Sequence, residues 1–167
     1  GSWVKDEASG QMHLESCPPG HSLTNEVVSG TFSQENQMCT ACQERSQYVI
    51  DPDNSTVGCQ ECPLGLTCDG TASYTPKVAN STWTSEDGVY KLKYCPVGYL
   101  KVTSPDVSQE CALCPAGSEC TTDDCEACTL CPPGKYKTAA SAEQCAICPT
   151  NTYNENDGSS SFGDCTG

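Results

Sequence analysis

Sixteen cysteines are the residues of this 167-residue chain whose type and spacing bear most directly on its chemistry. Most of them stand in C-x2-C pairs, a spacing that serves disulfide bridges, thiolate metal sites or redox centres. Residues 59–68 and 111–120 share the template C-x2-C-P-x-G-x2-C. A second pattern, C-P-x-G followed later by C-x2-C, occurs at 17–42, 95–114 and 131–148. This repetition predicts a chain of small cross-linked units.

Zinc coordination is the main alternative chemistry. The run Cys39-x2-Cys42-x16-Cys59-x2-Cys62 satisfies the spacing of a four-thiolate site. Three features favour disulfides instead. Further cysteines lie in C-P-x-G turns outside any four-ligand set, two glycosylation sequons suggest export, and the basic residues usual around nucleic-acid-binding zinc modules are scarce. We therefore expect no metal and no other cofactor.

Redox and hydrolytic chemistry are both weakly supported. Cys125-x2-Cys128-x2-Cys131 has the spacing of a redox motif, but reactive pairs normally sit at a helix N-terminus. The acidic residues that precede it would raise a thiol pKa rather than lower it. The chain has only two histidines and lacks G-x-S-x-G, phosphate-loop and H-E-x-x-H motifs. The sequence therefore predicts that the protein is not an enzyme.

Two polar stretches have partial calcium-ligand character. Asp51 with Asp53, and residues 154–158, place oxygen ligands close together along the chain. Neither completes the twelve-residue loop with its closing glutamate. Solvated turns are the favoured interpretation, and weak calcium binding stays an open alternative.

The composition explains why cross-links are needed. The chain has 2 Phe, 2 Trp and only two isoleucines. Burial at about 25 cal/mol per Å² would struggle to offset about 1–2 kcal/mol of backbone entropy per ordered residue. A disulfide that closes about 15 residues removes roughly 3 kcal/mol of unfolded-state freedom, so eight bridges could replace a core. Full pairing requires an oxidising compartment, and we expect the protein to be secreted or on the extracellular face of the cell surface.

The sequons and the charge agree with export. Asn54-Ser55-Thr56 and Asn80-Ser81-Thr82 make Asn54 and Asn80 candidate glycosylation sites. The net charge of −14 repels phosphate backbones and anionic lipids, which argues against nucleic acid and membrane surfaces as partners. No apolar run approaches the length of about 18 residues that a membrane span needs, so we expect no membrane insertion of this segment.

Short strands are the elements expected to position the cysteines. Residues 47–50 predict one strand, and 69–94 is the one long stretch without cysteine. Within it, Tyr90, Leu92 and Tyr94 alternate with Val89, Lys91 and Lys93, which predicts a strand with one apolar face. Asp87-Gly88 precedes this strand and predicts the turn of a hairpin. Trp83 would join them in the largest apolar cluster of the chain. Helical periodicity is absent over any useful length.

The last repeat carries a family resemblance. At 131–165, C-P-P-G-K-Y…C-A-I-C-P…T-Y…C resembles the ephrin-receptor-like cysteine-rich repeat, which is related to growth-factor-receptor and tumour-necrosis-factor-receptor modules. C-P-P-G-H at 17–21 and C-P-V-G-Y at 95–99 resemble further copies. The resemblance implies a small disulfide-rich fold, an extended tandem array of cysteine-rich modules with short two-stranded antiparallel sheets and little or no helix.

Five segments follow from these patterns. They are a lead segment at 1–16, cysteine-rich modules at 17–68, 95–130 and 131–167, and a β-hairpin insertion at 69–94. The insertion and the crowded cysteines of 120–131 depart from the simple repeat. The spacing C-x2-C-x16-C recurs at 39–59 and 145–165, and in the last copy the next cysteine would fall beyond residue 167. We therefore expect the array to continue in a longer protein.

The resemblance implies sequential pairing where the pattern is clean: Cys17–Cys39, Cys42–Cys59, Cys62–Cys68, Cys95–Cys111, Cys131–Cys145 and Cys148–Cys165. The remaining four cysteines allow three pairings. The crossed one, Cys114–Cys125 with Cys120–Cys128, is predicted because it avoids a strained C-x2-C bridge.

Three functions are compatible with the sequence. The resemblance implies a non-catalytic spacer or adhesion segment of a large extracellular protein, with other extracellular proteins or further copies of its own array as partners. A second hypothesis is a receptor-type module that binds a protein ligand through an exposed hairpin surface of Trp83, Tyr90, Leu92 and Tyr94. The third, an intracellular zinc protein, requires free thiols.

Overall fold

The computed structural model describes the backbone of residues 1–28 and 31–167 and the side chains of 1–25 and 36–167. These residues form sixteen short strands, which pair into eight two-stranded sheets. Helical structure in this part of the chain is limited to two 3-10 turns, η1 (Asp106–Ser108) and η2 (Phe162–Asp164). Eight disulfides use all sixteen cysteines. The predicted small disulfide-rich fold is confirmed.

The chain divides into two compact units, of which unit 1 comprises residues 1–77 and 85–91. Four antiparallel sheets form in chain order in this unit: β1 (Ser2–Lys5) with β2 (Met12–Ser16), β3 (His21–Val28) with β4 (Thr31–Ala41), β5 (Gln47–Tyr48) with β6 (Gln60–Glu61), and β7 (Leu66–Cys68) with β8 (Tyr74–Pro76).

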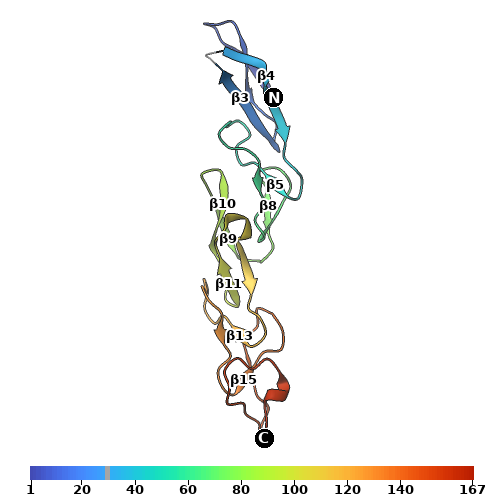
Figure 1. Cartoon of the computed structure of the whole chain (residues 1–167), viewed down its shortest axis with the longest axis vertical. Helices are drawn as coiled ribbons and strands as arrows, with labels where there is room; N and C mark the ends of the chain where they lie inside the picture. The colour runs from blue at the N-terminus through green and yellow to red at the C-terminus, as the bar shows by residue number, and fades with distance from the viewer. Residues whose placement is uncertain (29–30) are drawn as a thin grey trace. The chain divides into compact units, whose positions relative to one another are not determined.

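Unit 2 comprises residues 78–84 and 92–167. Its antiparallel sheets follow one another in chain order (Figure 1): β11 (Tyr99–Val102) with β12 (Glu110–Leu113), β13 (Ser118–Glu119) with β14 (Thr129–Leu130), and β15 (Lys135–Tyr136) with β16 (Ala146–Ile147). The predicted hairpin is also present, as β9 (Thr82–Glu86) paired with β10 (Val89–Tyr94). Its tip belongs to unit 1. Asp87 and Gly88 at the turn both have positive φ, as a type I′ turn requires.

One local arrangement recurs along the chain, and the segment after Cys131 shows it most simply. The Lys135 N–H donates to the Pro132 carbonyl at 3.1 Å and closes the C-P-P-G turn. Lys135 then pairs with Ile147 across β15 and β16. Cys148, which follows Ile147, donates its N–H to the Gly134 carbonyl at 2.9 Å. The Cys131–Cys145 disulfide closes this unit, which we call the turn–strand–disulfide unit.

The same geometry appears with different turn residues. In each case the first cysteine bonds the cysteine that lies two residues before the partner of the first strand residue. The C-P-x-G turns set this up because proline fixes one φ and glycine accepts the left-handed φ that follows. Where glycine is missing, Arg45 and Asn151 occupy its place, with φ of 71° and 68°. The bonds of this type are Cys17–Cys39, Cys42–Cys59, Cys95–Cys111, Cys114–Cys128 and Cys131–Cys145. Cys148–Cys165 closes a related loop, in which Tyr153 forms a single β-bridge with Thr166, the residue after Cys165.

The apolar cores are correspondingly small. In unit 1 Leu14, Cys17 and Leu23 form one cluster, against which Cys39 packs. Buried amides supplement them, because a two-stranded sheet leaves backbone groups unpaired along both edges. The Gln37 side chain, 5% exposed, accepts from the Leu14 N–H at 2.6 Å. Residues 1–16 thus form a hairpin whose second strand packs against β3 and β4.

Candidate functional site

Four cysteines of unit 2 lie close together and form two disulfides. We call them the four-cysteine cluster: Cys114, Cys120, Cys125 and Cys128. The structure joins Cys114 to Cys128 and Cys120 to Cys125. The predicted crossed pairing, Cys114–Cys125 with Cys120–Cys128, is therefore wrong. The other six bonds in the structure join the same cysteines that the sequence pairs.

Strand register explains the correction. Ser118 pairs with Leu130 across β13 and β14, and this register brings Cys128, two residues before Leu130, to the cysteine at the head of the turn. Cys114 therefore takes the place that Cys131 has in the next unit. Avoiding a C-x2-C bridge was insufficient as a criterion, since the observed pairing avoids one as well. The signal that could have found it is the recurrent offset between the disulfide and the strand partner.

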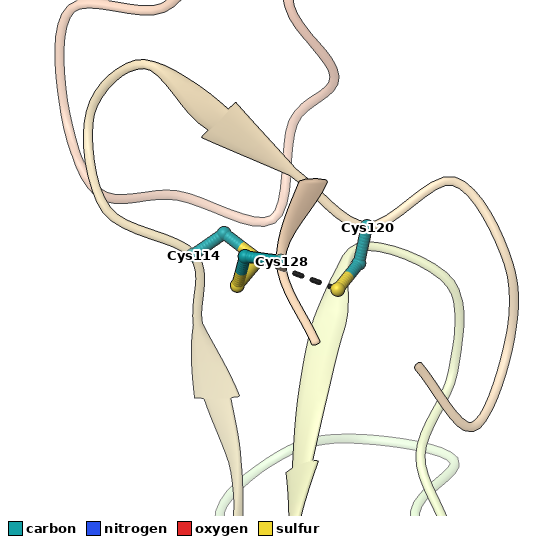
Figure 2. A group of neighbouring side chains, drawn as sticks. All are labelled: Cys114, Cys120 and Cys128. Carbon is teal, nitrogen blue, oxygen red and sulfur yellow. Dashed lines mark hydrogen bonds between the residues drawn. A yellow bond between two sulfur atoms is a disulfide. The ribbon is translucent and has the colours of Figure 1, made fainter. Parts of the chain in front are cut away.

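The two disulfides of the cluster lie against each other. The Cys114 Sγ is 3.3 Å from the Cys120 Sγ (Figure 2). Neither sulfur carries a hydrogen, because each is bonded to another cysteine, so this is a sulfur–sulfur contact. The sulfurs of Cys114, Cys120 and Cys128 all lie within 4.8 Å of one another. Oxidised sulfur is a poor metal ligand, so the cluster as it stands is a covalent cross-link.

The cysteines of the zinc alternative do not meet at one site. They take part in three separate bridges, Cys17–Cys39, Cys42–Cys59 and Cys62–Cys68. The redox motif is likewise divided, since Cys125, Cys128 and Cys131 each bond a different partner. Spacing alone could not separate these readings, because C-x2-C is compatible with all of them.

A buried cation lies beside the four-cysteine cluster. Lys137 is 5% exposed, and its ammonium donates to three carbonyls, those of Cys114 at 3.2 Å, Ser118 at 2.9 Å and Ser141 at 2.7 Å. Burial lowers the pKa of Lys137, while the Glu119 carboxylate opposes that shift. Glu119 is itself 5% exposed and accepts from the Cys145 N–H. Sequence reasoning missed both residues, because charged side chains are expected at the surface.

Acidic side chains hold the first cysteine of two C-P-x-G turns. An Asp124 carboxylate oxygen accepts from the Cys95 N–H at 3.0 Å and forms an ion pair with Lys101, also at 3.0 Å. The Cys95 N–H is the first cause that holds the pKa of Asp124 below its ordinary value, and the bond to Lys101 adds to it. In the same manner, an Asp53 carboxylate oxygen accepts a hydrogen bond from the Cys17 N–H at 3.2 Å.

The stretches with calcium-ligand character therefore have structural roles. Asp51 accepts from the Asp53 N–H within its turn. Asn154, 3% exposed, accepts from the Gly134 N–H at 3.0 Å and donates to the Lys135 carbonyl at 2.9 Å. Its amide bonds a neighbouring turn–strand–disulfide unit.

The predicted contact surface on the hairpin is largely inside the protein. Trp83, Tyr90 and Leu92 are 8%, 5% and 4% exposed, so the expectation of an exposed aromatic cluster is wrong for these three. Only Tyr94 is partly exposed. Period-2 alternation predicts that one face of a strand is apolar, but it does not say that this face meets solvent.

Tyr90 is buried by other tyrosines of unit 1. Its ring lies 4.5 Å from that of Tyr48 and 4.6 Å from that of Tyr74, measured between centroids. Its hydroxyl donates to the Ala72 carbonyl, and its N–H donates to the Tyr48 hydroxyl at 2.9 Å. Burial raises the pKa of Tyr90 to about 12. The ring therefore serves as core for the second half of unit 1.

Three exposed aliphatic side chains occupy the same register position in unit 2. Each precedes a cysteine and pairs with the first strand residue after the preceding turn: Leu113 with Tyr99, Leu130 with Ser118, and Ile147 with Lys135. They are 48%, 63% and 75% exposed. Sequence reasoning missed them because strands of two to four residues are too short to show a hydrophobic period.

Both predicted glycosylation sites are accessible. Asn54 is half-buried, and its side-chain oxygen accepts from the Thr56 hydroxyl at 2.7 Å. Asn80 is exposed and has a φ of 65°. Within the described residues, no helix is long and apolar enough to cross a membrane.

The comparisons with known proteins point to one family. The family model for the tyrosine-protein kinase ephrin type A/B receptor-like repeat matches residues 121–165. No curated protein matches the sequence. The matched residues hold the recurrent turns, the short sheets and the disulfides described above. Residues 121–165 are therefore part of an ephrin-receptor-like cysteine-rich repeat.

Proposed function

We propose that this chain is a non-catalytic spacer segment of a secreted or cell-surface protein. An ephrin-receptor-like repeat with eight disulfides fits an extracellular cysteine-rich module, and the spacer role goes beyond that. The observation that carries it is the locality of the cross-links: each bond joins cysteines only 5 to 22 residues apart. Stability is thus built unit by unit, as in proteins that keep a chain extended.

The same units support the module boundaries expected from the sequence. We propose that 17–68, 95–130 and 131–167 are cysteine-rich modules and that 69–94 is an insertion between them. The turn–strand–disulfide units that start at Cys17, Cys95 and Cys131 support the module starts. Other copies of the same array, or other extracellular proteins, would be the neighbours of such a segment.

Small-angle X-ray scattering of the oxidised chain tests the spacer role. A compact globular protein of this length has a radius of gyration of about 15 Å. A spacer should give a value well above this, together with an elongated distance distribution that is independent of protein concentration. A radius near the globular value would contradict the proposal. The fully reduced and alkylated chain is the control, because it reports the dimensions without cross-links.

A second candidate function is contact with another extracellular protein. The three register-equivalent side chains Leu113, Leu130 and Ile147 favour it, since repeated exposed aliphatic groups suit a repeated contact. The net charge of −14 further favours a partner with a basic rim around an apolar surface.

Replacement of all three aliphatic residues by serine tests this candidate. The oxidised variant should keep its eight disulfides and lose a partner that the native chain captures from extracellular material. Val107→Ser is the matched control, because Val107 is 47% exposed but lies outside the equivalent positions. Equal capture by the triple variant and the native chain would exclude this surface.

A further inference from the structure

The two copies of one cysteine template are bonded differently in this chain. Residues 59–68 and 111–120 share the template C-x2-C-P-x-G-x2-C. In the first copy the last two cysteines of the template, Cys62 and Cys68, are bonded to each other. In the second copy the equivalent residues, Cys114 and Cys120, are in sulfur–sulfur contact at 3.3 Å but are bonded elsewhere.

We propose that Cys114, Cys120, Cys125 and Cys128 form a thiol–disulfide exchange site at which a small thiol converts the observed pairing into Cys114–Cys120 with Cys125–Cys128. The second of these bonds is a C-x2-C bridge, the spacing that redox-active disulfides use, and its strain makes the product the minor pairing. The proposal rests on the contact between two disulfides and does not depend on the spacer function. The reactant is a low-molecular-weight thiol, which is regenerated, so the number of disulfides does not change.

Access determines where the reaction starts. Cys114, Cys120 and Cys125 are 0%, 2% and 8% exposed, whereas Cys128 is partly exposed. Thiolate attack requires that the target sulfur be reachable, so Cys128 is the point of entry. The thiolate bonds the Cys128 sulfur, the Cys114–Cys128 bond breaks, and its electron pair leaves on Cys114.

Two features make Cys114 the favoured leaving group. Its backbone carbonyl accepts from the buried Lys137 ammonium at 3.2 Å, which places a positive charge at the backbone of the residue that carries the released thiolate. A nearby lysine stabilises a thiolate, and a better-stabilised thiolate leaves faster. The released Cys114 sulfur already touches Cys120 (Figure 2), so the next attack requires little movement.

The remaining steps balance. The Cys114 thiolate bonds Cys120 and breaks the Cys120–Cys125 bond, and the electron pair leaves on Cys125. That thiolate then attacks the mixed disulfide on Cys128, forms Cys125–Cys128 and expels the small thiolate. Each step breaks one sulfur–sulfur bond and forms one, and no external oxidant or reductant is consumed.

The backbone holds Cys125 in place during the exchange. The Lys101 N–H donates to the Cys125 carbonyl at 2.8 Å, and Leu100 forms a β-bridge with Cys125. The Ala127 carbonyl lies 3.1 Å from the Cys125 sulfur and 3.8 Å from the Cys120 sulfur. The sulfurs of Cys114, Cys120 and Cys128 lie within 4.8 Å of one another and Cys125 is bonded to Cys120, so the exchange takes place among neighbouring atoms.

Disulfide mapping of the intact oxidised chain tests the proposal. The chain is incubated with cysteamine, a cationic thiol suited to a protein of net charge −14, then quenched with acid. An endoprotease specific for Asp and Glu then separates the four cysteines, because acidic residues 119, 123, 124 and 126 lie between them. A Cys114–Cys120 linkage that accumulates while the intact mass is unchanged supports the site.

Recovery of only Cys114–Cys128 and Cys120–Cys125, at every cysteamine concentration below that which reduces the whole chain, would overturn it. The Cys62–Cys68 bond is the internal reference and should not change.

A pair of variants provides a second measurement. Cys125→Ala with Cys128→Ala leaves Cys114 and Cys120 without their present partners. We expect this variant to form a Cys114–Cys120 bond and seven disulfides in all, whereas two free thiols would contradict the proposal. The matched control is Cys120→Ala with Cys125→Ala, which keeps Cys114–Cys128 and removes the exchange partner. Should a variant not fold, the mapping of the native chain decides.

Discussion

Cys114 and Cys120 touch through their sulfur atoms at 3.3 Å without being bonded, although the equivalent Cys62 and Cys68 form a disulfide. The difference follows from the residue that lies two positions before the partner of the first strand residue after each turn. Leu66 pairs with Pro76, and position 74 is a tyrosine, so Cys62 bonds within its own template. In the second copy that position is Cys128, which takes Cys114. The presence of Cys128 at this position thus changes the disulfide pairing of a template that the two segments share.

The C-P-x-G turns should be sensitive to any side chain at the glycine when a neighbouring unit packs against it. Gly98 has a φ of 95°, and a Cβ there would collide with the Ala142 carbonyl. Gly10 has a φ of 72° but open space around it. We expect Gly10→Ala to cost about 1 kcal/mol for the left-handed conformation alone. Gly98→Ala should cost about 1–3 kcal/mol more, because the backbone must also shift.

Chemical unfolding of both glycine variants under non-reducing conditions measures the difference in free energy. Equal losses in the two variants would show that packing against Ala142 contributes nothing.

The buried Lys137 should stabilise unit 2 through its three carbonyl partners. Lys137→Met keeps the length of the side chain but leaves those acceptors and the Glu119 carboxylate without the ammonium. Because buried acceptors without donors carry a desolvation cost, we expect a loss of about 1–3 kcal/mol. Lys135→Met, two residues earlier and less buried, is the control. Thermal unfolding of the oxidised variants gives the comparison, and a Lys137→Met variant as stable as the control would refute the role.

Tyr90 should give unit 1 a stability that is lost at high pH. Burial raises the pKa of Tyr90 to about 12 from the ordinary value of 10.0. The folded state therefore keeps the phenol proton that the unfolded chain releases first. The contribution is complete below pH 10 and falls as the pH rises towards 12.

The ultraviolet absorbance of tyrosinate monitors this group. In Tyr90→Phe the ionisation near pH 12 should be missing, and loss of the bond to the Ala72 carbonyl should cost about 1 kcal/mol at neutral pH. Tyr153→Phe, at a 54% exposed tyrosine, should retain that transition. Its persistence in Tyr90→Phe would assign it to another group.

Asp124 should make the first turn of unit 2 sensitive to acid. The Cys95 N–H and Lys101 hold the pKa of Asp124 below its ordinary value of 3.8, so the folded state binds that proton less tightly than the unfolded chain. The contribution is present above about pH 4 and is lost as the pH falls through the lowered pKa. Amide hydrogen exchange of Cys95 should accelerate over that range. Asp124→Asn should show a smaller change with pH, and an identical profile would exclude the carboxylate.

Both sequons should carry glycans when the chain is expressed through a secretory pathway. Asn80 is exposed and Asn54 is half-buried in a polar turn, so neither is hidden by the fold. The intact mass should fall in two steps, one for Asn54→Gln and one for Asn80→Gln, and enzymatic removal of N-glycans should abolish the difference. A native chain with the unmodified mass would contradict the prediction.

Much of the fold was predictable because its bonds are local. In a C-P-x-G turn the proline and the glycine fix the backbone conformation themselves. A short loop between two cysteines leaves few other cysteines close enough to form a disulfide. Residues 17–68 and 131–165 therefore follow the spacing of their cysteines closely. The hairpin at Asp87-Gly88 was equally predictable, since that dipeptide tolerates the positive φ of a type I′ turn.

The sequence by itself determined that the chain is a series of small disulfide-stabilised units, because turn residues and loop lengths act over a few positions. Tertiary structure decided which of three pairings joins Cys114, Cys120, Cys125 and Cys128, since strand register selects the partner. It also decided that Trp83 and Tyr90 lie inside, because burial depends on segments distant in sequence. The contact between Cys114 and Cys120 arises from that same register, which no spacing rule contains.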